Sequence, residues 1–488
     1  KIAVIGSGII GYIASSYLSE QGHMVDCISP RLNSVKLLIK DQHSYSASYE
    51  NTVSIKFDRE DFKESKSISD SYYQKSAHKF LGLELIDEIG LARYWGANLA
   101  IKGLKNELEN LNLSEDELDF ISRSIPVLDV FDFYSDHLGD KKNKNMKNRL
   151  KNIKYEDSES IKSSTLALYA DLCKGADLPD ERRNSAIFGS EFEAPSTYTR
   201  IDGLVEKISF GEREVLPSVL ISTPTKKYIE TYDYILVTCG SIGSYRLINK
   251  SFRDVDSYPL YSRIKHHPVF VTICFVPQIK YPRKYISMSN FDIRMSTKYG
   301  SVYLNFFPFK GALKAFNRTK YNSFIGLKLK ALLRKVNVFI NRLPDIPIFP
   351  NWWLHRLYVS NVYLPSEYTS SFIGMKGNQI DLVGGYRSDF EKTAIRRLWP
   401  YILFKLVKNK IIPISIWPKI VQTGGDMHYS STLESFTNEE GNIFKDNKPV
   451  KRVLVIDSSS SRILPITNPT YYFVARAIKL LRRFRSEK

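Results

Sequence analysis

The chain opens on the stretch Lys1-Ile-Ala-Val-Ile5-Gly6-Ser-Gly8-Ile-Ile-Gly11. A short apolar run leads into a Gly-x-Gly-x-x-Gly pattern, and apolar residues then recur at helical spacing over residues 12–20. A second apolar run covers residues 24–29. Strand, glycine-rich turn, helix and second strand in this order predict the β-α-β unit that binds a dinucleotide. We therefore expect an α/β fold built on a Rossmann-like domain.

Each glycine of this motif has its own task. Gly6 permits a tight turn, Gly8 lets the backbone approach a pyrophosphate, and Gly11 lets helix and strand pack closely. The phosphates then lie at the N-terminus of the helix, where backbone N–H groups point at them. Two further residues of the turn, Ser7 and Ile10, belong to the same predicted cofactor site.

The end of the second strand departs from the usual pattern. An acidic residue at this point would bind the adenosine ribose, but the chain has Ser29 and then Arg31. A serine hydroxyl can hydrogen-bond to a ribose hydroxyl, whereas serine together with arginine also suits the 2′-phosphate of NADP. Both residues are predicted cofactor contacts, and this unit alone leaves FAD and NADP open.

Two central segments predict further contacts between backbone and cofactor. Residues 232–248 begin as an apolar strand, pass through Cys-Gly-Ser-Ile-Gly-Ser and enter a helix; their candidate contacts are Cys239, Gly240, Ser241 and Ser244. Residues 199–210 predict a strand that enters a β-meander continuing to residue 228. Val205 in that strand is the candidate for a backbone contact with adenine, as in flavoproteins of this architecture. A second strand end that faces the cofactor favours FAD over NADP.

Near the C-terminus, an apolar run over residues 453–456 ends in Asp457 and a cluster of serines. A loop follows and ends in Thr-Asn-Pro-Thr at 467–470, after which residues 470–483 predict a helix. Thr or Asn at the loop end can cap this helix, and proline suits its first turn. Polar groups thus gather at the positive end of a helix dipole, an arrangement that stabilises negative charge during a reaction.

Taken together, these segments resemble the glucose–methanol–choline (GMC) family of flavin oxidoreductases. In that family a strand ends in Asp-(Ala/Gly)-Ser, and after a proline an Asn-Pro-Thr/Asn opens a helix beneath the flavin ring, as residues 453–483 do here. Gly90-Leu-Ala-Arg-Tyr-Trp-Gly-Ala-Asn98 resembles the segment that lies against the isoalloxazine in sugar-oxidising members. The resemblance adds these cofactor contacts: Trp95, Gly96, Asn98, Asp457, Ser458, Asn468, Pro469 and Thr470.

Residues 422–432 resemble the family's Gly-x-x-His-x-x-Gly-Thr segment, which carries the catalytic histidine. Gly425, His428 and Thr432 match it, and Ser431 stands in place of the second glycine. An unperturbed imidazole titrates near pH 6.5, so His428 can act as a neutral base near pH 7. Lys265-His-His-Pro268 resembles the family's Asp-His-Pro, which marks passage into the substrate domain, and we expect both of its histidines to be structural.

The resemblance implies an FAD-dependent enzyme that oxidises a CH–OH group of a small alcohol or carbohydrate, with a sugar as the first candidate. His428 would take the hydroxyl proton, Asn468 would hold the same oxygen, and hydride would pass to flavin N5. Two alternatives stay open. A degenerate flavin site in a peripheral membrane or polysaccharide-assembly protein would explain Ser29, and so would an NADP-dependent reductase.

Chain length predicts more than one domain, because 488 residues exceed what one compact core accommodates. Residues 269–420 alternate strand and helix patterns, which favours an antiparallel sheet flanked by helices. We expect a discontinuous FAD-binding domain of residues 1–105, 195–262 and 421–488. The substrate or cap domain would comprise residues 106–194 and 263–420.

The net charge of +18 suits nucleic acid, an anionic membrane surface or an anionic substrate, or it reflects lysine used for solubility. No recognisable nucleic-acid-binding module occurs, whereas residues 324–359 and 396–417 are basic and rich in tryptophan and other apolar residues, which suits a membrane surface or a cover over the substrate sheet. Four widely spaced cysteines predict neither a disulfide framework nor a metal site and suit a reducing, cytoplasmic compartment. We expect no signal peptide and no transmembrane helix.

Overall fold

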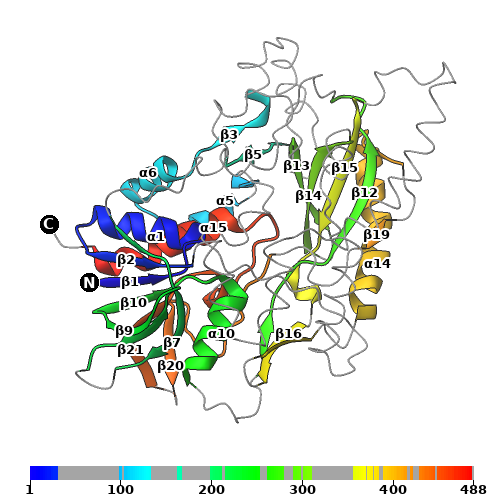
Figure 1. The fold of residues 1–488 in the computed structure, drawn as a ribbon. Helices are drawn as coiled ribbons and strands as arrows, with labels where there is room; N and C mark the ends of the chain where they lie inside the picture. The colour runs from blue at the N-terminus through cyan, green and yellow to red at the C-terminus, as the bar shows by residue number, and fades with distance from the viewer. Residues whose placement is uncertain are drawn as a thin grey trace.

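The computed structural model in Figure 1 describes residues 1–30, 98–101, 104–132, 162–167, 198–211, 215–252, 261–279, 290–297, 300–309, 355–369, 371–376, 379–383, 388–414, 418–420, 428–445 and 448–485. The described elements form two main sheets. A largely parallel sheet lies in the half of the molecule that contains both termini, and an antiparallel sheet lies in the other half.

The parallel sheet has six strands, β1 (Ile2–Ile5), β2 (Val25–Ile28), β6 (Thr199–Ile201), β10 (Tyr234–Val237), β20 (Asn442–Lys445) and β21 (Lys448–Val455). Their order is β20-β21-β10-β1-β2-β6, and only β20 runs antiparallel to its neighbour. The segments that the sequence predicted as strands 1–5, 24–29, 232–237 and 453–456 therefore lie side by side in one sheet.

Alternating side chains of this sheet pack into two cores. Ile2 and Val4 belong to the core beneath α1 (Ile9–Glu20) and α15 (Thr470–Leu481), whereas Ala3 and Ile5 belong to the core beneath α10 (Gly240–Phe252). A strand turns successive side chains to opposite faces, and both faces are covered here. This explains why every residue of β1 is buried. Figure 1 shows α1 and α15 side by side along one face of the sheet.

The segment predicted as one strand over residues 199–210 forms two. It divides at Asp202-Gly203, where β6 ends, and β7 (Leu204–Ser209) begins a meander with β8 (Ser218–Ser222) and β9 (Lys227–Thr231). A side chain at Gly203 would place its Cβ 2.8 Å from Cγ2 of Ile221, so the chain turns at a residue without one. The correction matters because β6 extends the parallel sheet while β7 leaves it.

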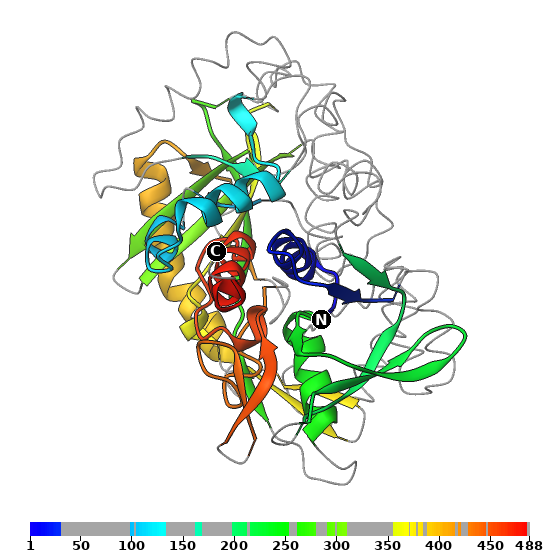
Figure 2. The same ribbon diagram turned by 90° about the vertical axis from the view of Figure 1, so that its left-hand side faces the viewer.

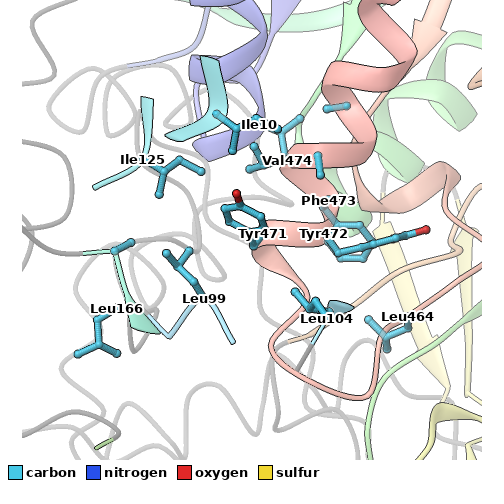
Figure 3. Packing of buried hydrophobic residues seen from close by; sticks show 14 of the residues in the cluster. Ile10, Leu99, Leu104, Ile125, Leu166, Leu464, Tyr471, Tyr472, Phe473 and Val474 are labelled. Atoms are coloured by element: carbon cyan, nitrogen blue, oxygen red, sulfur yellow. The ribbon is translucent and has the colours of Figure 1, made fainter. Parts of the chain in front are cut away.

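The C-terminal helix lies within the larger core. Figure 3 shows Val474 of α15 next to Ile10 of α1, with Tyr471 and Phe473 on the same helix. The predicted helix over 470–483 is confirmed, with its last residues forming the 3₁₀ helix η6 (Arg482–Phe484). Packing against α1, rather than helix propensity, holds α15 in place, because ten of its twelve residues are buried.

The antiparallel sheet has the order β18-β12-β15-β14-β13-β4, and β19 also pairs with β12. Helix α14 (Ser388–Lys408) packs on it through Trp399, whose ring meets Phe270 of β12 edge-on at 5.4 Å. The strands are β4 (Lys162–Ser163), β12 (Val269–Phe275), β13 (Phe291–Thr297), β14 (Gly300–Pro308), β15 (Leu357–Tyr363), β18 (Ile412–Pro413) and β19 (Lys419–Ile420).

Smaller elements complete the described structure, among them α6 (Glu115–Ser124), which packs near the end of α15. Helix α6 begins with a capping box between Ser114 and Glu117, and Glu117 also pairs with Arg482 at 2.6 Å beyond the end of α15. Thus part of the predicted cap segment packs on the helices of the parallel sheet. The remaining elements are α5 (Lys105–Glu109), β3 (Leu128–Asp129), β5 (Thr165–Leu166), β11 (Ser262–Ile264), η4 (Ser366–Tyr368), β16 (Ser371–Lys376), β17 (Gln379–Val383) and η5 (Ser458–Ser460).

The architecture confirms the predicted fold class, a Rossmann-like unit joined to an antiparallel sheet with a flanking helix. The residue limits of the two domains stay predictions. No helix among the described residues has the length and apolar character needed to cross a bilayer.

Candidate active site

The strand ends of the parallel sheet bring the predicted cofactor segments to one edge. Ile5 at the end of β1 pairs with Ile28 of β2 on one side and with Val237 of β10 on the other. Val237 in turn pairs with Val455 of β21. Because these strands run parallel, the residues that follow them emerge together, and ligands of such sheets bind outside this edge.

The turn between β1 and α1 is built from backbone in close contact. Gly6 has a φ of +99°, which favours glycine. A Cβ on Gly11 would lie 1.7 Å from the carbonyl oxygen of Gly6, so a side chain there would push helix and turn apart. Thr238 holds the turn from β10, its hydroxyl lying 2.7 Å from the same carbonyl. These contacts account for the first and third glycines of the motif.

The N-terminus of α1 is available to an anion. Its N-cap is Gly8, which makes no side-chain capping hydrogen bond, and its first turn contains no acidic residue. The leading N–H groups of a helix carry a partial positive charge and lack partners within the helix. A phosphate group therefore fits this position among the described residues.

The N-terminus of α10 is filled by a carboxylate of the protein. Oδ2 of Asp457, just beyond β21, accepts hydrogen bonds from the N–H of Gly240 at 2.8 Å and the hydroxyl of Ser244 at 2.5 Å. Oδ1 accepts from the N–H of Ser459 at 2.9 Å. Burial raises the pKa of Asp457, and these hydrogen bonds oppose the rise. Asp457, Gly240 and Ser244, which the sequence assigned to the cofactor, thus bind one another.

Two further hydrogen bonds fix the segment that carries His428. The hydroxyl of Ser241 donates to the carbonyl of Tyr429 at 2.6 Å, and the hydroxyl of Thr432 donates to the carbonyl of Ser241 at the same distance. Between them Ser431 has a φ of +66°, the left-handed conformation that favours glycine. The family segment that residues 422–432 resemble has glycine at this position, and the left-handed φ of Ser431 gives a physical reason for it.

His428 and Asn468 lie together. The Nδ2 atom of Asn468 is 3.5 Å from the Nε2 atom of His428, although the residues are 40 positions apart. Oδ1 of Asn468 accepts a hydrogen bond of 3.1 Å from the N–H of Thr470 at the start of α15. This bond determines which end of the amide faces the helix and leaves the NH2 group toward the imidazole. Helix start and histidine loop thus form one polar site.

Aromatic rings hold the imidazole of His428. Tyr363, the last residue of β15, stacks on it with a centroid distance of 5.6 Å and an angle of 23°, and His267 meets it edge-on at 6.1 Å. Nδ1 of His428 is buried without a hydrogen-bond partner among the described residues. Burial, with a smaller effect of His267, lowers the pKa of His428 from 6.5 to about 3. The imidazole is therefore neutral near pH 7 but much less basic than an unperturbed histidine.

The two neighbouring histidines of the 265–268 segment are fully enclosed. His266 has its Nε2 atom 3.1 Å from the hydroxyl of Ser371. His267 lies between two carbonyl groups, with Nδ1 3.0 Å from that of Leu364 and Nε2 2.9 Å from that of Pro465. His267 thus connects the end of β15 with the loop that leads to Asn468, which agrees with the structural role expected for both.

Solved structures match this chain in fold, although no sequence comparison does. No protein family and no curated protein sequence compared with the chain matches it. Pyridoxine 4-oxidase from Mesorbium loti matches with a TM-score of 0.55 and 12% identity, over 99% of this chain and 98% of that one. A variant of formate oxidase from Aspergillus oryzae, studied for its effect on FAD modification, matches with a TM-score of 0.52 and 10% identity, over 100% and 98%. The chain therefore shares the fold of these two oxidases over nearly its whole length.

Some sequence-predicted contacts bond or pack against other parts of the protein, and others lie outside the described residues. Asn98 donates to Oδ1 of Asp292 at 3.2 Å and to the hydroxyl of Tyr303 at 3.0 Å, both on the antiparallel sheet. The side chain of Ile10 is buried in the core, which leaves only its backbone for a cofactor. Arg31, Trp95, Gly96 and Gly425 lie outside the described residues.

The other predicted contacts lie in the turns after the parallel strands, in β7 and at the start of α15. Ser29 is buried, and its backbone N–H donates a hydrogen bond of 3.0 Å to the carbonyl of Ile201 in β6. Val205 is buried in β7 at a bulge, and the thiol of Cys239 donates to the carbonyl of Ile5 at 3.2 Å. Ser7 is buried in the turn after β1, and Pro469 is the N-cap of α15. The hydroxyl oxygens of Ser458 and Ser241 are 2.7 Å apart.

Sequence reasoning missed Tyr363 and Tyr303. Their rings lie 5.9 Å apart, and Tyr363 is the one stacked on His428. The only signal was their position in strands of a predicted second domain, where aromatic residues are common for packing alone. No group of three or more His, Cys, Asp or Glu residues that could hold a metal ion occurs in the described part of the chain.

Proposed function

We propose that this chain is an FAD-dependent oxidoreductase that oxidises a CH–OH group of a small molecule to a carbonyl. The observation that carries the proposal is the pair of His428 and Asn468, whose side-chain nitrogens lie 3.5 Å apart. A base and a hydrogen-bond donor at one point are what removal of a hydroxyl proton requires. The GMC fold raises this expectation by analogy.

The residues present fit FAD. The turn at Gly6 and Gly11 admits no Cβ, and the N-terminus of α1 has neither a side-chain cap nor an acidic residue in its first turn. We assign the pyrophosphate to this turn, with Ser7, Gly8 and Ile10 contributing backbone and Ser29 facing the ribose. Asn468, Pro469 and Thr470 would meet the flavin at the start of α15. When bound, the flavin supplies the acceptor for the hydride.

His428 would act as the base. With its pKa near 3 the imidazole is neutral at physiological pH and can accept a proton, although lower basicity makes it a weaker base than a free histidine. Asn468, held by Thr470, would donate its N–H to the same hydroxyl oxygen as the proton leaves. The ring of Tyr363 restricts rotation of the imidazole, so the acceptor nitrogen stays aimed at one point.

A carbohydrate is our first candidate for the substrate, and the net charge of +18 would favour a sugar that carries negative charge. The support is the Trp-Gly segment at 95–96, which resembles that of sugar-oxidising members. The matched structures are named as oxidases of other compounds, pyridoxine and formate. A cytoplasmic location is part of the same proposal. The membrane association that the sequence left open is a separate question from the substrate and concerns helix α14.

An absorbance scan of the purified protein tests the proposal. A flavin spectrum supports it, whereas a colourless protein would favour a degenerate site, and binding that depends on a 2′-phosphate without a flavin spectrum would favour an NADP-dependent reductase. His428→Ala is expected to retain yellow FAD and to lose bleaching of the flavin by substrate. His23→Ala is the control, because His23 contacts Phe484 at the far end of α1. Full flavin reduction in His428→Ala would remove His428 from the role of base.

A further inference from the structure

Helix α14 has an inner face that packs and an outer face that does not. Ile395, Leu398, Trp399, Ile402 and Leu406 are buried toward the antiparallel sheet. On the opposite side, Tyr401 is 43% exposed, Phe404 69% and Val407 51%, at the three-residue spacing that places side chains along one stripe. Figure 1 shows α14 in the half of the molecule that contains the antiparallel sheet, away from the parallel sheet, and in Figure 2 the helix lies towards the left side.

The segment that follows the helix exposes two more large apolar side chains. Ile412 of β18 and Ile414 next to it are 47% and 49% exposed. Scattered exposed apolar residues are normal on a protein surface, but five within fourteen residues of chain form a group. We call Tyr401, Phe404, Val407, Ile412 and Ile414 the α14 stripe.

Cationic residues surround the α14 stripe. Arg396 and Arg397 are exposed one turn before it, and Lys408 and Lys410 are exposed at its other end. Residues 393–420 contain no aspartate or glutamate. The acidic residues of α14, Asp389 and Glu391, both lie in its first turn, before this stretch. Large apolar side chains between cations are the chemistry of a helix that lies in the interface of an anionic membrane.

We propose that the α14 stripe is a membrane-docking face that binds anionic phospholipid. Phe404 and Val407 would enter the acyl boundary, and the arginines before them and the lysines after them would meet lipid phosphates. A second copy of the chain is a poorer occupant, because a symmetric contact through this face would bring the same cations together. The proposal is independent of the proposed oxidoreductase activity and concerns where the protein acts.

Sedimentation with lipid vesicles tests the proposal on the full chain. The protein is expected to bind vesicles of phosphatidylcholine with about one-third phosphatidylserine and to bind pure phosphatidylcholine at least tenfold more weakly, with binding reduced by salt. The double variant Phe404→Ser with Val407→Ser should lose roughly tenfold or more in the partition coefficient, and so should Arg396→Gln with Arg397→Gln. Because all four side chains are exposed, their replacement should leave thermal unfolding unchanged.

A matched control removes exposed apolar side chains elsewhere. Met24→Ser with Val215→Ser replaces residues that are 72% and 68% exposed without a change of charge, and it should bind vesicles like the wild type. Failure of the wild type to bind anionic vesicles would overturn the proposal. Equal loss in the control variant would do so too. A change of oligomeric state by light scattering, confined to the α14 variants, would instead assign the stripe to contact between copies.

Discussion

Replacement of His266 should make the protein less sensitive to acid. Burial lowers the pKa of His266 from 6.5 to about 3, because the enclosed ring cannot be solvated when charged. In the unfolded chain the imidazole takes up a proton as the pH falls below about 6.5, while in the folded chain it stays neutral. The unfolded state therefore binds more protons, and stability contributed by the neutral form is lost as the pH falls.

The size of the effect follows from the width of that interval. Each pH unit below the unfolded pKa removes about 1.4 kcal/mol of folding free energy, so acidification from about pH 6.5 to about pH 4.5 removes roughly 2 kcal/mol through this one residue. His266→Gln should be less stable than the wild type at neutral pH, since it alters a packed site. The gap between the two proteins should then shrink by about 2 kcal/mol at the lower pH.

Equilibrium urea unfolding at the two pH values, followed by tryptophan fluorescence and circular dichroism, measures this double difference. Ser371→Ala is the matched control, because it removes the hydroxyl 3.1 Å from Nε2 yet keeps the imidazole. Its gap from the wild type should stay constant with pH. A gap that also stays constant for His266→Gln would refute the reasoning, since it would mean that His266 titrates alike in folded and unfolded chains.

Two further substitutions probe the candidate site. Ser431→Gly should change the free energy of unfolding in urea by less than about 1 kcal/mol. Relief of the left-handed φ of +66° offsets loss of the 2.6 Å hydrogen bond from the serine hydroxyl to the carbonyl of Ser461. Ser431→Val, which keeps the unfavourable φ and loses the bond, should lower the free energy of unfolding by about 2 kcal/mol or more. His267→Asn should lower kcat by roughly tenfold or more with little change in KM, because the ring between the carbonyls of Leu364 and Pro465 positions His428 and Asn468. A variant that loses stability but keeps the wild-type kcat would show that His267 only packs.

The parts of the fold with local sequence signals were predictable. The β1–α1–β2 unit follows from glycine spacing and apolar periodicity over residues 1–29, and α15 follows from the loop that ends at Asn468-Pro469 and the apolar residues after it. The proximity of His428 and Asn468 was reached through resemblance to a family, since nothing local relates two residues on different segments. The division of residues 199–210 was missed because Asp202-Gly203 gives only a weak break.

Properties that depend on burial could not be read from the chain. Burial lowers the pKa of His428, with a smaller effect of His267, and the rings of His267 and Tyr363 that pack against the imidazole come from distant segments. The conformation of Ser431 is likewise imposed by its hydrogen bonds, which include one from its N–H to the carbonyl of Ser458 at 3.1 Å. A single sequence records the residue types at these positions but not what surrounds them.

The choice between the two glycine turns shows what the structure adds to the cofactor argument. Both β1 and β10 end in glycines that lead into a helix, so the sequence offers two sites for a phosphate. At α10 the carboxylate of Asp457 already accepts the N–H of Gly240, and a phosphate there would meet a negative charge. Arg476 donates to the carbonyl of Asp457 and to the hydroxyl of Ser460 from α15, which fixes that turn further. Of the two helices, α1 is therefore the one to which we assign the anion, whereas Ser241 of α10 holds the segment next to His428 through its bonds to Tyr429 and Thr432.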